Sequence, residues 1–231
     1  MKKFFSTFSF MIILAVLGFA AYAAFPQRSE AEVLNVSQAS ASDFSNGAGA
    51  APEAPAATLN YNAIGMPLNA SASIGDADAL ATAIAGTQTV LKWDAGSQTF
   101  DFWIPGVGIG NNFAVTTGDA FLVQVDSTAP TVFSIVGDVP SQSGAGSVSH
   151  SLVGNATCKY NFITVPLSQS SITTADQLAT AIGDVDTVLV WDAASQTFDF
   201  WIPGIGIGNN FAVNSGYPYW VCMTASKTWP S

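Results

Sequence analysis

The chain has 231 residues, of which 10% are charged, and its 16 acidic residues against 6 basic ones give a net charge of −10 at pH 7. This balance excludes nucleic acid as an expected partner, because phosphate binding needs a basic stripe on the surface. The length is enough for one large domain or two small ones.

Residues 1–23 have the pattern of a secretory signal peptide. Lys2 and Lys3 precede an apolar stretch, and small residues at Ala21 and Ala23 provide a cleavage site after residue 23. An uncleaved membrane anchor is the alternative, because the apolar stretch approaches the roughly 20 residues that cross a bilayer. We therefore expect a secreted or cell-surface protein with no membrane contact beyond this peptide.

Residues 24–56 are rich in Ala, Ser, Gly and Pro, which predicts a flexible segment. The part that most favours a strand is Glu-Val-Leu-Asn-Val-Ser at residues 32–37, whose apolar positions are Val33, Leu34 and Val36. These three residues are a candidate donor strand for the sheet edge of a neighbouring subunit.

A tandem duplication is the most informative feature of the chain. Residues 93–115 read WDAGSQTFDFWIPGVGIGNNFAV, and residues 191–213 repeat this sequence with two changes, Ala194 for Gly96 and Ile205 for Val107. Self-similarity at a fixed spacing is the signature of repeated structural units. The expected organisation is module 1 over residues 57–137, a linker over 138–147 and module 2 over 148–231.

Both modules predict the same order of elements. Asp76 and Thr174 are expected to cap short helices at their N-termini, and Gln177 completes a capping box with Thr174. The expected elements are a first strand (61–68 and 160–167), a helix (76–84 and 174–182), a hairpin (89–93 with 98–104, and 187–191 with 196–202) and a last strand (121–125 and 219–223). The fold class is therefore mainly β with one short helix per module, as two tandem homologous β-sandwich-like modules.

The connection between the modules also alternates like a strand, at residues 131–137 and 148–154. Module 1 has no match to the second of these segments, and module 2 has no match to the first. We therefore expect each module to lack one strand at its outer end, which leaves an open sheet edge that another chain can pair with.

Cys158 and Cys222 both fall in module 2, where their counterparts in module 1 are Leu59 and Gln124. In an exported chain an even pair of cysteines predicts a disulfide, here between the first and last strands of the module. A reactive or metal-binding thiol pair is the alternative.

The shared pattern is Y-N-x-I-x-x-P-L, a short helix, W-D-A-x-S-Q-T-F-x-F-W-x-P-G and N-N-F-A-V. It resembles the tandem Trp-Asp/Phe-Trp-Ile-Pro-Gly β-repeat modules of bacterial secreted and cell-surface proteins, over residues 61–228. The resemblance implies an adhesive, wall-associated or filament component rather than an enzyme, and it carries no activity over to this chain.

Catalytic candidates are few. His150 is the only histidine, and the carboxylate pair Asp94 and Asp101 recurs as Asp192 and Asp199 across the second hairpin. A turn cap explains Asp94, and an exposed strand position explains Asp101, so no catalytic residue is expected.

Oxygen ligands for calcium at Asp76 and Asp78, or at Asp184 and Asp186, have a simpler explanation as helix and turn caps. We expect neither a metal site nor a cofactor.

Trp103 and Trp201 are candidate platforms for a sugar ring, with Asp101 and Asp199 beside them. Period-two alternation places Trp103 on the face opposite Phe100 and Phe102. Packing of this face on the helix is the alternative that we favour.

These observations favour a non-enzymatic, exported cell-surface protein for assembly or adhesion. In its sharper form this is a filament subunit linked to its neighbours by β-strand addition. The alternative is a pair of carbohydrate-binding modules that use Trp103 and Trp201. Expected partners are further copies of the chain, or a cell-surface or glycan partner.

Overall fold

The computed structural model describes residues 59–126 and 133–230. The signal peptide and the candidate donor residues Val33, Leu34 and Val36 lie outside the described residues. In chain order the elements are β1 (Leu59–Gly65), α3 (Ala77–Ala83), β2 (Thr87–Asp94), β3 (Thr99–Ile104), β4 (Ile109–Gly110), β5 (Ala120–Asp126), β6 (His150–Leu152), β7 (Lys159–Thr164), α4 (Ala175–Ile182), β8 (Val185–Asp192), β9 (Thr197–Ile202), β10 (Ile207–Gly208), β11 (Pro218–Met223) and β12 (Lys227–Trp229).

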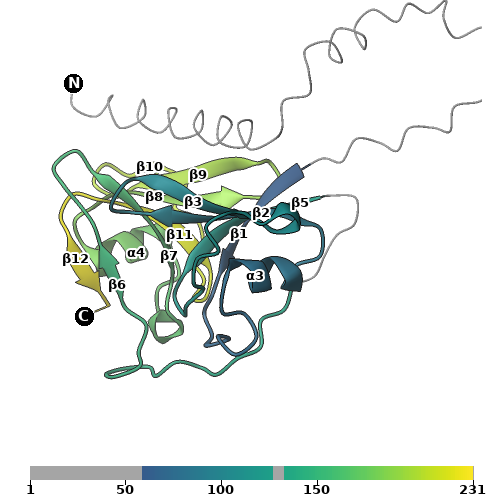
Figure 1. The fold of residues 1–231 in the computed structure, drawn as a ribbon. Coiled ribbons are helices and arrows are strands. Elements are labelled where there is room, and N and C mark those ends of the chain that lie inside the picture. The colour runs from purple at the N-terminus through teal and green to yellow at the C-terminus, as the bar shows by residue number, and fades with distance from the viewer. Residues whose placement is uncertain (1–58, 127–132, 231) are drawn as a thin grey trace, which may run out of the picture. The chain divides into compact units, whose positions relative to one another are not determined.

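Each of the two modules, called repeat 1 and repeat 2 from here on, forms one five-stranded antiparallel sheet with one helix (Figure 1). The strand order is β1-β5-β2-β3-β4 in repeat 1 and β7-β11-β8-β9-β10 in repeat 2, so the two sheets have the same topology. The predicted fold class, mainly β with one short helix per repeat, is confirmed. Every predicted strand of the repeated core is present, and no end is shifted by more than three residues.

The prediction of a missing strand in repeat 2 is wrong, because Lys227–Trp229 form β12. This strand pairs with β6 as a separate two-stranded sheet beside α4, and does not extend the five-stranded sheet (Figure 1). Leu152 and Trp229 from the pair belong to the same apolar core as α4. Residues 133–137 form no strand; instead Phe133 and Ile135 pack against the core of repeat 1.

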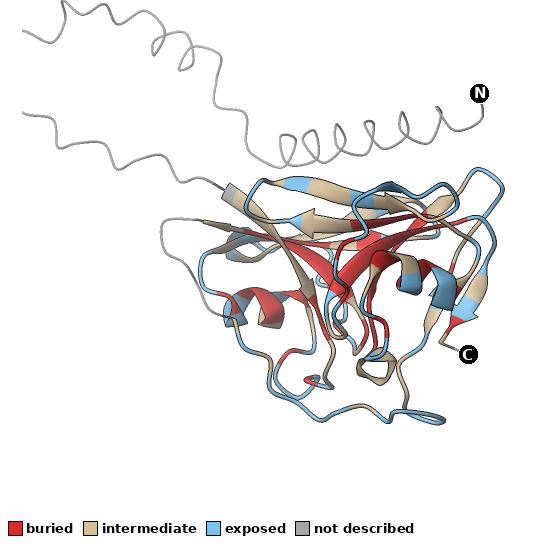
Figure 2. Ribbon diagram, turned by 180° about the vertical axis from the view of Figure 1, so that it is seen from behind, coloured by how far each residue is buried: buried red, intermediate tan, exposed pale blue. Residues whose placement is uncertain are grey.

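Each helix begins at the predicted cap. Asp76 accepts a hydrogen bond from the Ala79 N–H, and Thr174 accepts one from the Gln177 N–H. The Gln177 side chain accepts from the Thr173 N–H rather than from that of Thr174, so the expected capping box is displaced by one residue. The inner side of each helix is buried against its own sheet (Figure 2).

The other face of each sheet packs against the other repeat. Trp220 of β11 is 4% exposed and lies at ring-centroid distances of 5.0 Å from Trp93 and 5.8 Å from Phe100, which both belong to repeat 1. It also stacks on Phe162 of its own repeat at 4.4 Å. This aromatic cluster makes residues 57–231 one compact unit, in which both sheets are covered on two faces.

A reciprocal set of hydrogen bonds joins the repeats. In one half, Trp93 Nε1 and Gln98 Nε2 donate to the Tyr160 carbonyl at 2.8 and 2.9 Å, while the Tyr160 N–H donates to Gln98 Oε1 at 2.9 Å. In the other half, Trp191 and Gln196 bind the backbone of Tyr61 in the same way, at 2.8 to 3.0 Å. We call these six bonds the inter-repeat clasp.

The clasp uses a glutamine side chain in place of a neighbouring strand. Tyr61 lies in β1 and Tyr160 in β7, which form one edge of their respective sheets. The amide of Gln98 offers one donor and one acceptor, and these are the groups that a paired strand would offer to Tyr160. The edges at β1 and β7 therefore point into the molecule at these residues, and are not free for another chain.

Gln98 and Gln196 hold a left-handed backbone conformation, with φ of 59° and 54°. This conformation is uncommon for a residue with a side chain and is usually left to glycine. Each closes a hairpin turn, and in the first turn the Gln98 N–H donates to the Asp94 carbonyl at 2.8 Å. Retaining glutamine rather than glycine at both positions indicates that the side-chain amide is required for the contact with the other repeat.

Gln98→Glu replaces the amide donor by a carboxylate that faces the carbonyls of Tyr160 and Ala95. We expect the free energy of unfolding to fall by about 1 to 3 kcal/mol, because a buried acceptor loses its donor. Urea denaturation measures the change. Gln88→Glu, an exposed site with the same change of charge, is the matched control, and equal losses in the two variants would contradict the role of the clasp.

Candidate functional site

The two tryptophans proposed as sugar platforms face the helices. Trp103 and Trp201 are partly buried and pack against the core of their own repeats. Trp103 Nε1 donates to Asp78 Oδ1 at 3.0 Å, and Trp201 Nε1 donates to Asp176 Oδ1 at 3.1 Å. The predicted alternation along β3 is confirmed. Both rings pack on the helix side of their sheets, as the favoured alternative predicted.

Asp101 and Asp199 lie on the same strands but bind other groups. Asp101 Oδ2 accepts from Asn111 Nδ2, and Asp199 Oδ2 accepts from Asn209 Nδ2, both at 2.6 Å. These bonds connect the second strand of each hairpin to the loop that follows it. The carboxylate that binds the Trp103 indole is therefore Asp78, in the first turn of α3, rather than Asp101.

The loops that follow β3 and β9 expose apolar side chains at matching positions. We call residues 105–110 and 203–208 the edge loops, because β4 and β10 inside them are the last strands of their sheets. Val107 and Ile109 are 66% and 50% exposed, and their counterparts Ile205 and Ile207 are 44% and 53% exposed. Repeated exposure of branched apolar residues is a surface property that the sequence pattern alone did not reveal.

One glycine at the end of each edge loop fixes its path. A Cβ added at Gly110 would lie 2.1 Å from the Phe102 carbonyl oxygen, and one at Gly208 would lie 2.2 Å from that of Phe200. Their φ angles are 104° and 102°, which only glycine adopts without strain. The edge loops therefore turn back tightly against the hairpin, and their apolar side chains remain on the surface.

The carboxylates of the hairpin turns act as turn caps. Asp94 accepts from the Gly96 N–H at 2.7 Å, and this bond, with a smaller effect from the Ser97 hydroxyl, lowers the pKa of Asp94. The Ser195 hydroxyl donates to Asp192 at 2.6 Å and is the main cause of the lowered pKa of Asp192, with the Ala194 N–H second. These bonds stabilise the ionised form of each turn carboxylate.

The His150 side chain is hydrogen-bonded and packed where the two repeats meet. Its Nε2 lies 2.9 Å from the Thr164 carbonyl, which only accepts, so the neutral ring donates its proton there. The ring stacks on Trp229 at 6.2 Å. Burial lowers the pKa of His150 below its ordinary value of 6.5, against smaller raising effects of the Thr164 carbonyl and Asp119.

The remaining predicted sites have defined partners. Cys158 and Cys222 form the predicted disulfide, with Cα atoms 5.5 Å apart, and it ties the residue before β7 to β11. Asp184 forms an ion pair with Lys227 at 2.8 Å. Within residues 59–126 and 133–230 no three His, Cys, Asp or Glu side chains gather as metal ligands.

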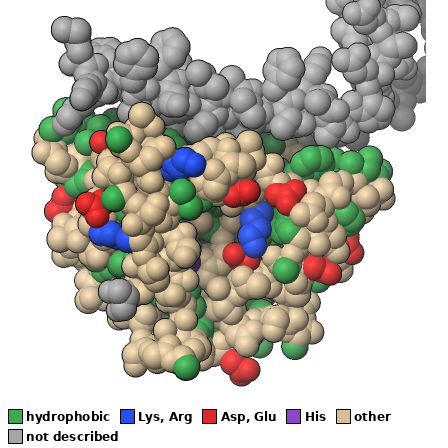
Figure 3. Space-filling model, turned by 60° about the vertical axis from the view of Figure 1, so that its left-hand side comes forward, with side chains coloured by type: hydrophobic (Ala, Val, Ile, Leu, Met, Phe, Trp, Pro, Cys, Tyr) green, Lys and Arg blue, Asp and Glu red, His purple; other side chains and the backbone are tan. Residues whose placement is uncertain are grey.

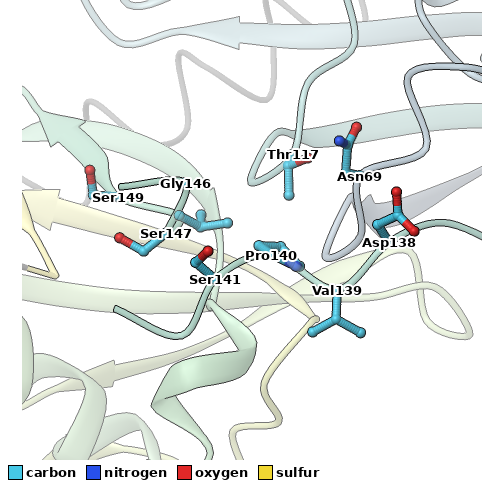
Figure 4. A pocket seen from close by; sticks show the side chains of 10 residues that line it. Asn69, Thr117, Asp138, Val139, Pro140, Ser141, Gly146, Ser147 and Ser149 are labelled. Carbon is cyan, nitrogen blue, oxygen red and sulfur yellow. The ribbon is translucent and has the colours of Figure 1, made fainter. Parts of the chain in front are cut away.

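A pocket of about 400 Å³ lies where the connection leaves repeat 1 (Figure 4). Asn69, Thr117 and Asp138 line one side, and Ser141, Ser147 and Ser149 lie across from them. Neither tryptophan-and-aspartate segment lines this pocket. The hollow is lined by residues of the connection between Asp138 and Ser149, together with Asn69 and Thr117 of repeat 1.

The burial of His150 predicts a dependence of stability on pH. Because its folded-state pKa is depressed, the unfolded chain binds more protons below 6.5, and the free energy of unfolding falls as the pH is lowered through that value. Thermal unfolding between pH 8 and 5 measures the slope. His150→Gln keeps a neutral donor for the Thr164 carbonyl and should flatten it, whereas an unchanged slope would assign the effect elsewhere. The lowered pKa values of Asp94 and Asp192 change the free energy of unfolding only when the pH falls below about 3.8, outside this range.

The described residues contain no helix that is both long enough and apolar enough to cross a membrane. The geometry brings together Trp103 with Asp78 and Cys158 with Cys222, and it pairs Asp101 with Asn111 rather than with the indole N–H of Trp103. No protein family, no curated protein and no solved structure was found to match the chain.

Proposed function

We propose that this chain is a non-enzymatic, exported surface protein that attaches to partner molecules, including other copies of itself, through its two edge loops. The observation that carries the proposal is the exposure of apolar side chains at the same loop positions in both repeats. Exposed apolar residues that gather at one place are typical of contact surfaces. Two equivalent contacts in one chain also make attachment bivalent, which strengthens binding without any new contact type.

The character of the remaining surface supports attachment through apolar contacts. On the face that Figure 3 shows, charged side chains are sparse and most of the surface is uncharged polar side chain or backbone. Attraction between charges then contributes little, and because copies with a net charge of −10 repel one another, added salt is expected not to weaken their association. Of the groups that were candidates for catalysis, the carboxylates of Asp94 and Asp192 cap turns. Those of Asp101 and Asp199 bind loop asparagines, and His150 binds the Thr164 carbonyl.

In this proposal, strand addition at the edges β4 and β10 contributes only a small part of the contact. The edge strands β4 and β10 have two residues each, and a glycine with positive φ ends each of them. Such short edges offer few backbone bonds to an added strand. Side chains such as Val107 and Ile205 therefore supply more of the proposed contact than a long ladder of backbone bonds.

Replacing the four exposed apolar residues by serine (Val107→Ser, Ile109→Ser, Ile205→Ser and Ile207→Ser) tests the proposal. We expect self-association, measured by sedimentation velocity, to weaken at least tenfold. Co-sedimentation with envelopes of the producing cells should fall by the same factor. Val136→Ser with Val139→Ser, which are 81% and 65% exposed outside the edge loops, is the control. Retention of both kinds of association by the fourfold variant, with its fold intact, would refute the proposal.

Carbohydrate binding by Trp103 and Trp201 is the alternative function, and the geometry counts against it, because the outer corner of each indole lies under an edge loop. A Cβ at Gly108 would lie 3.8 Å from Trp103 Cη2, and one at Gly206 would lie 3.7 Å from Trp201 Cη2. We expect the wild-type chain to capture no sugar on a glycan array, since both indole N–H groups already bind carboxylates. A sugar that is bound by wild type and lost in a folded Trp103→Phe/Trp201→Phe variant would favour this candidate instead.

A further inference from the structure

The inter-repeat clasp has a consequence that does not depend on the edge loops. Repeat 1 contributes Gln98 and accepts Gln196, while repeat 2 contributes Gln196 and accepts Gln98. We infer that the clasp also forms between two copies of this chain, with repeat 1 of one copy closed on repeat 2 of the other. The partner is a second copy, and the interaction surface is the one that each chain otherwise closes internally.

The hydrogen bonds and ring contacts between the repeats fit this exchange. Beyond the clasp, Lys159 Nζ donates to the Gly96 carbonyl at 3.0 Å, and the Thr164 hydroxyl donates to the Asp119 carbonyl at 2.7 Å. Each of these bonds crosses from one repeat to the other, as the ring contact between Trp93 and Trp220 does. A repeat from another molecule offers the same atoms, so an exchanged pair loses none of these contacts.

The connection between the repeats contains the segment that must open. Asp138 is held to repeat 1 by backbone bonds with Asn69 at 2.8 and 3.0 Å, and His150 begins β6 on repeat 2. Residues 139–149 lie between these two anchors and are mostly exposed. Fully extended, these eleven residues reach about 36 to 40 Å. The chain between the anchors is therefore long enough to pass to a neighbouring molecule.

The hollow described above lies between the two ends of this segment. The segment surrounds the hollow in Figure 4, with Asp138 on one side and Ser149 on the other. Ser141 and Ser147 form a bridge within it, so residues 142–146 make a small loop of their own. If that small loop is removed, residues 139–141 and 147–149 still connect the two sides of the hollow. If the whole segment is removed, no residue remains between Asp138 and His150.

Deleting residues 139–149 from the full chain joins Asp138 directly to His150, at the 3.8 Å that separates consecutive Cα atoms. The repeats of one copy then cannot close across the hollow, and we expect twice the monomer mass, or a longer series, in sedimentation equilibrium. Deleting only residues 142–146 is the matched control and should leave a monomer. A folded monomer from the larger deletion would overturn the inference.

The wild-type chain provides a second measurement in case the deletion variant fails to fold. Refolding at rising protein concentration should increase the dimer fraction, and two differently labelled pools refolded together should give mixed dimers by energy transfer. A non-reducing gel should show single chains, because Cys158 and Cys222 already pair within one repeat. Monomer at every concentration would overturn the inference. The serine variant of the edge loops should exchange as wild type does, so the two proposals fail separately.

Discussion

The contact of Gln98 with Tyr160, and of Gln196 with Tyr61, decides how the two copies of the repeat are arranged. A sheet edge with unsatisfied backbone groups must pair, be covered or face water. Here a side-chain amide takes the place of a strand, and the indole of Trp93 or Trp191 adds a third bond to the same residue. Once these edges face inward, the aromatic faces of both sheets are brought together, and the remaining edges point outward at β4 and β10.

The same constraint explains why the sequence between Trp93 and Val115 is almost identical to its second copy. Trp93 and Gln98 reach across to the other repeat, whereas Trp103 reaches back to the helix of its own repeat. Gly110 then allows the loop to turn against the hairpin. One short segment therefore supplies the cross-repeat contact, the core of its own repeat and the surface loop, so few of its positions are free to change.

Local rules were sufficient for much of the fold. Alternation along residues 99–104 predicted the face of Trp103, the capping residue Asp76 predicted the start of a helix, and an even number of cysteines predicted the disulfide. Partners distant in the chain were not predictable in this way. Asp78 lies 25 residues before the indole that it binds, and Tyr160 lies 62 residues after Gln98. The three-residue strand β12 is too short for alternation to reveal, since its pairing with β6 depends on tertiary contacts.

Trp220 shows what joining two copies in one chain makes available. Its counterpart in repeat 1 is Leu122, and that of its stacking neighbour Phe162 is Ala63. A symmetric pair of identical subunits must place the same residue on both sides of its axis, so a bulky ring there is met by a second one. A covalent duplication lifts this restriction, because one half can enlarge while the other shrinks. The result is a heterotypic fit in which a first half prefers a second half over its own kind.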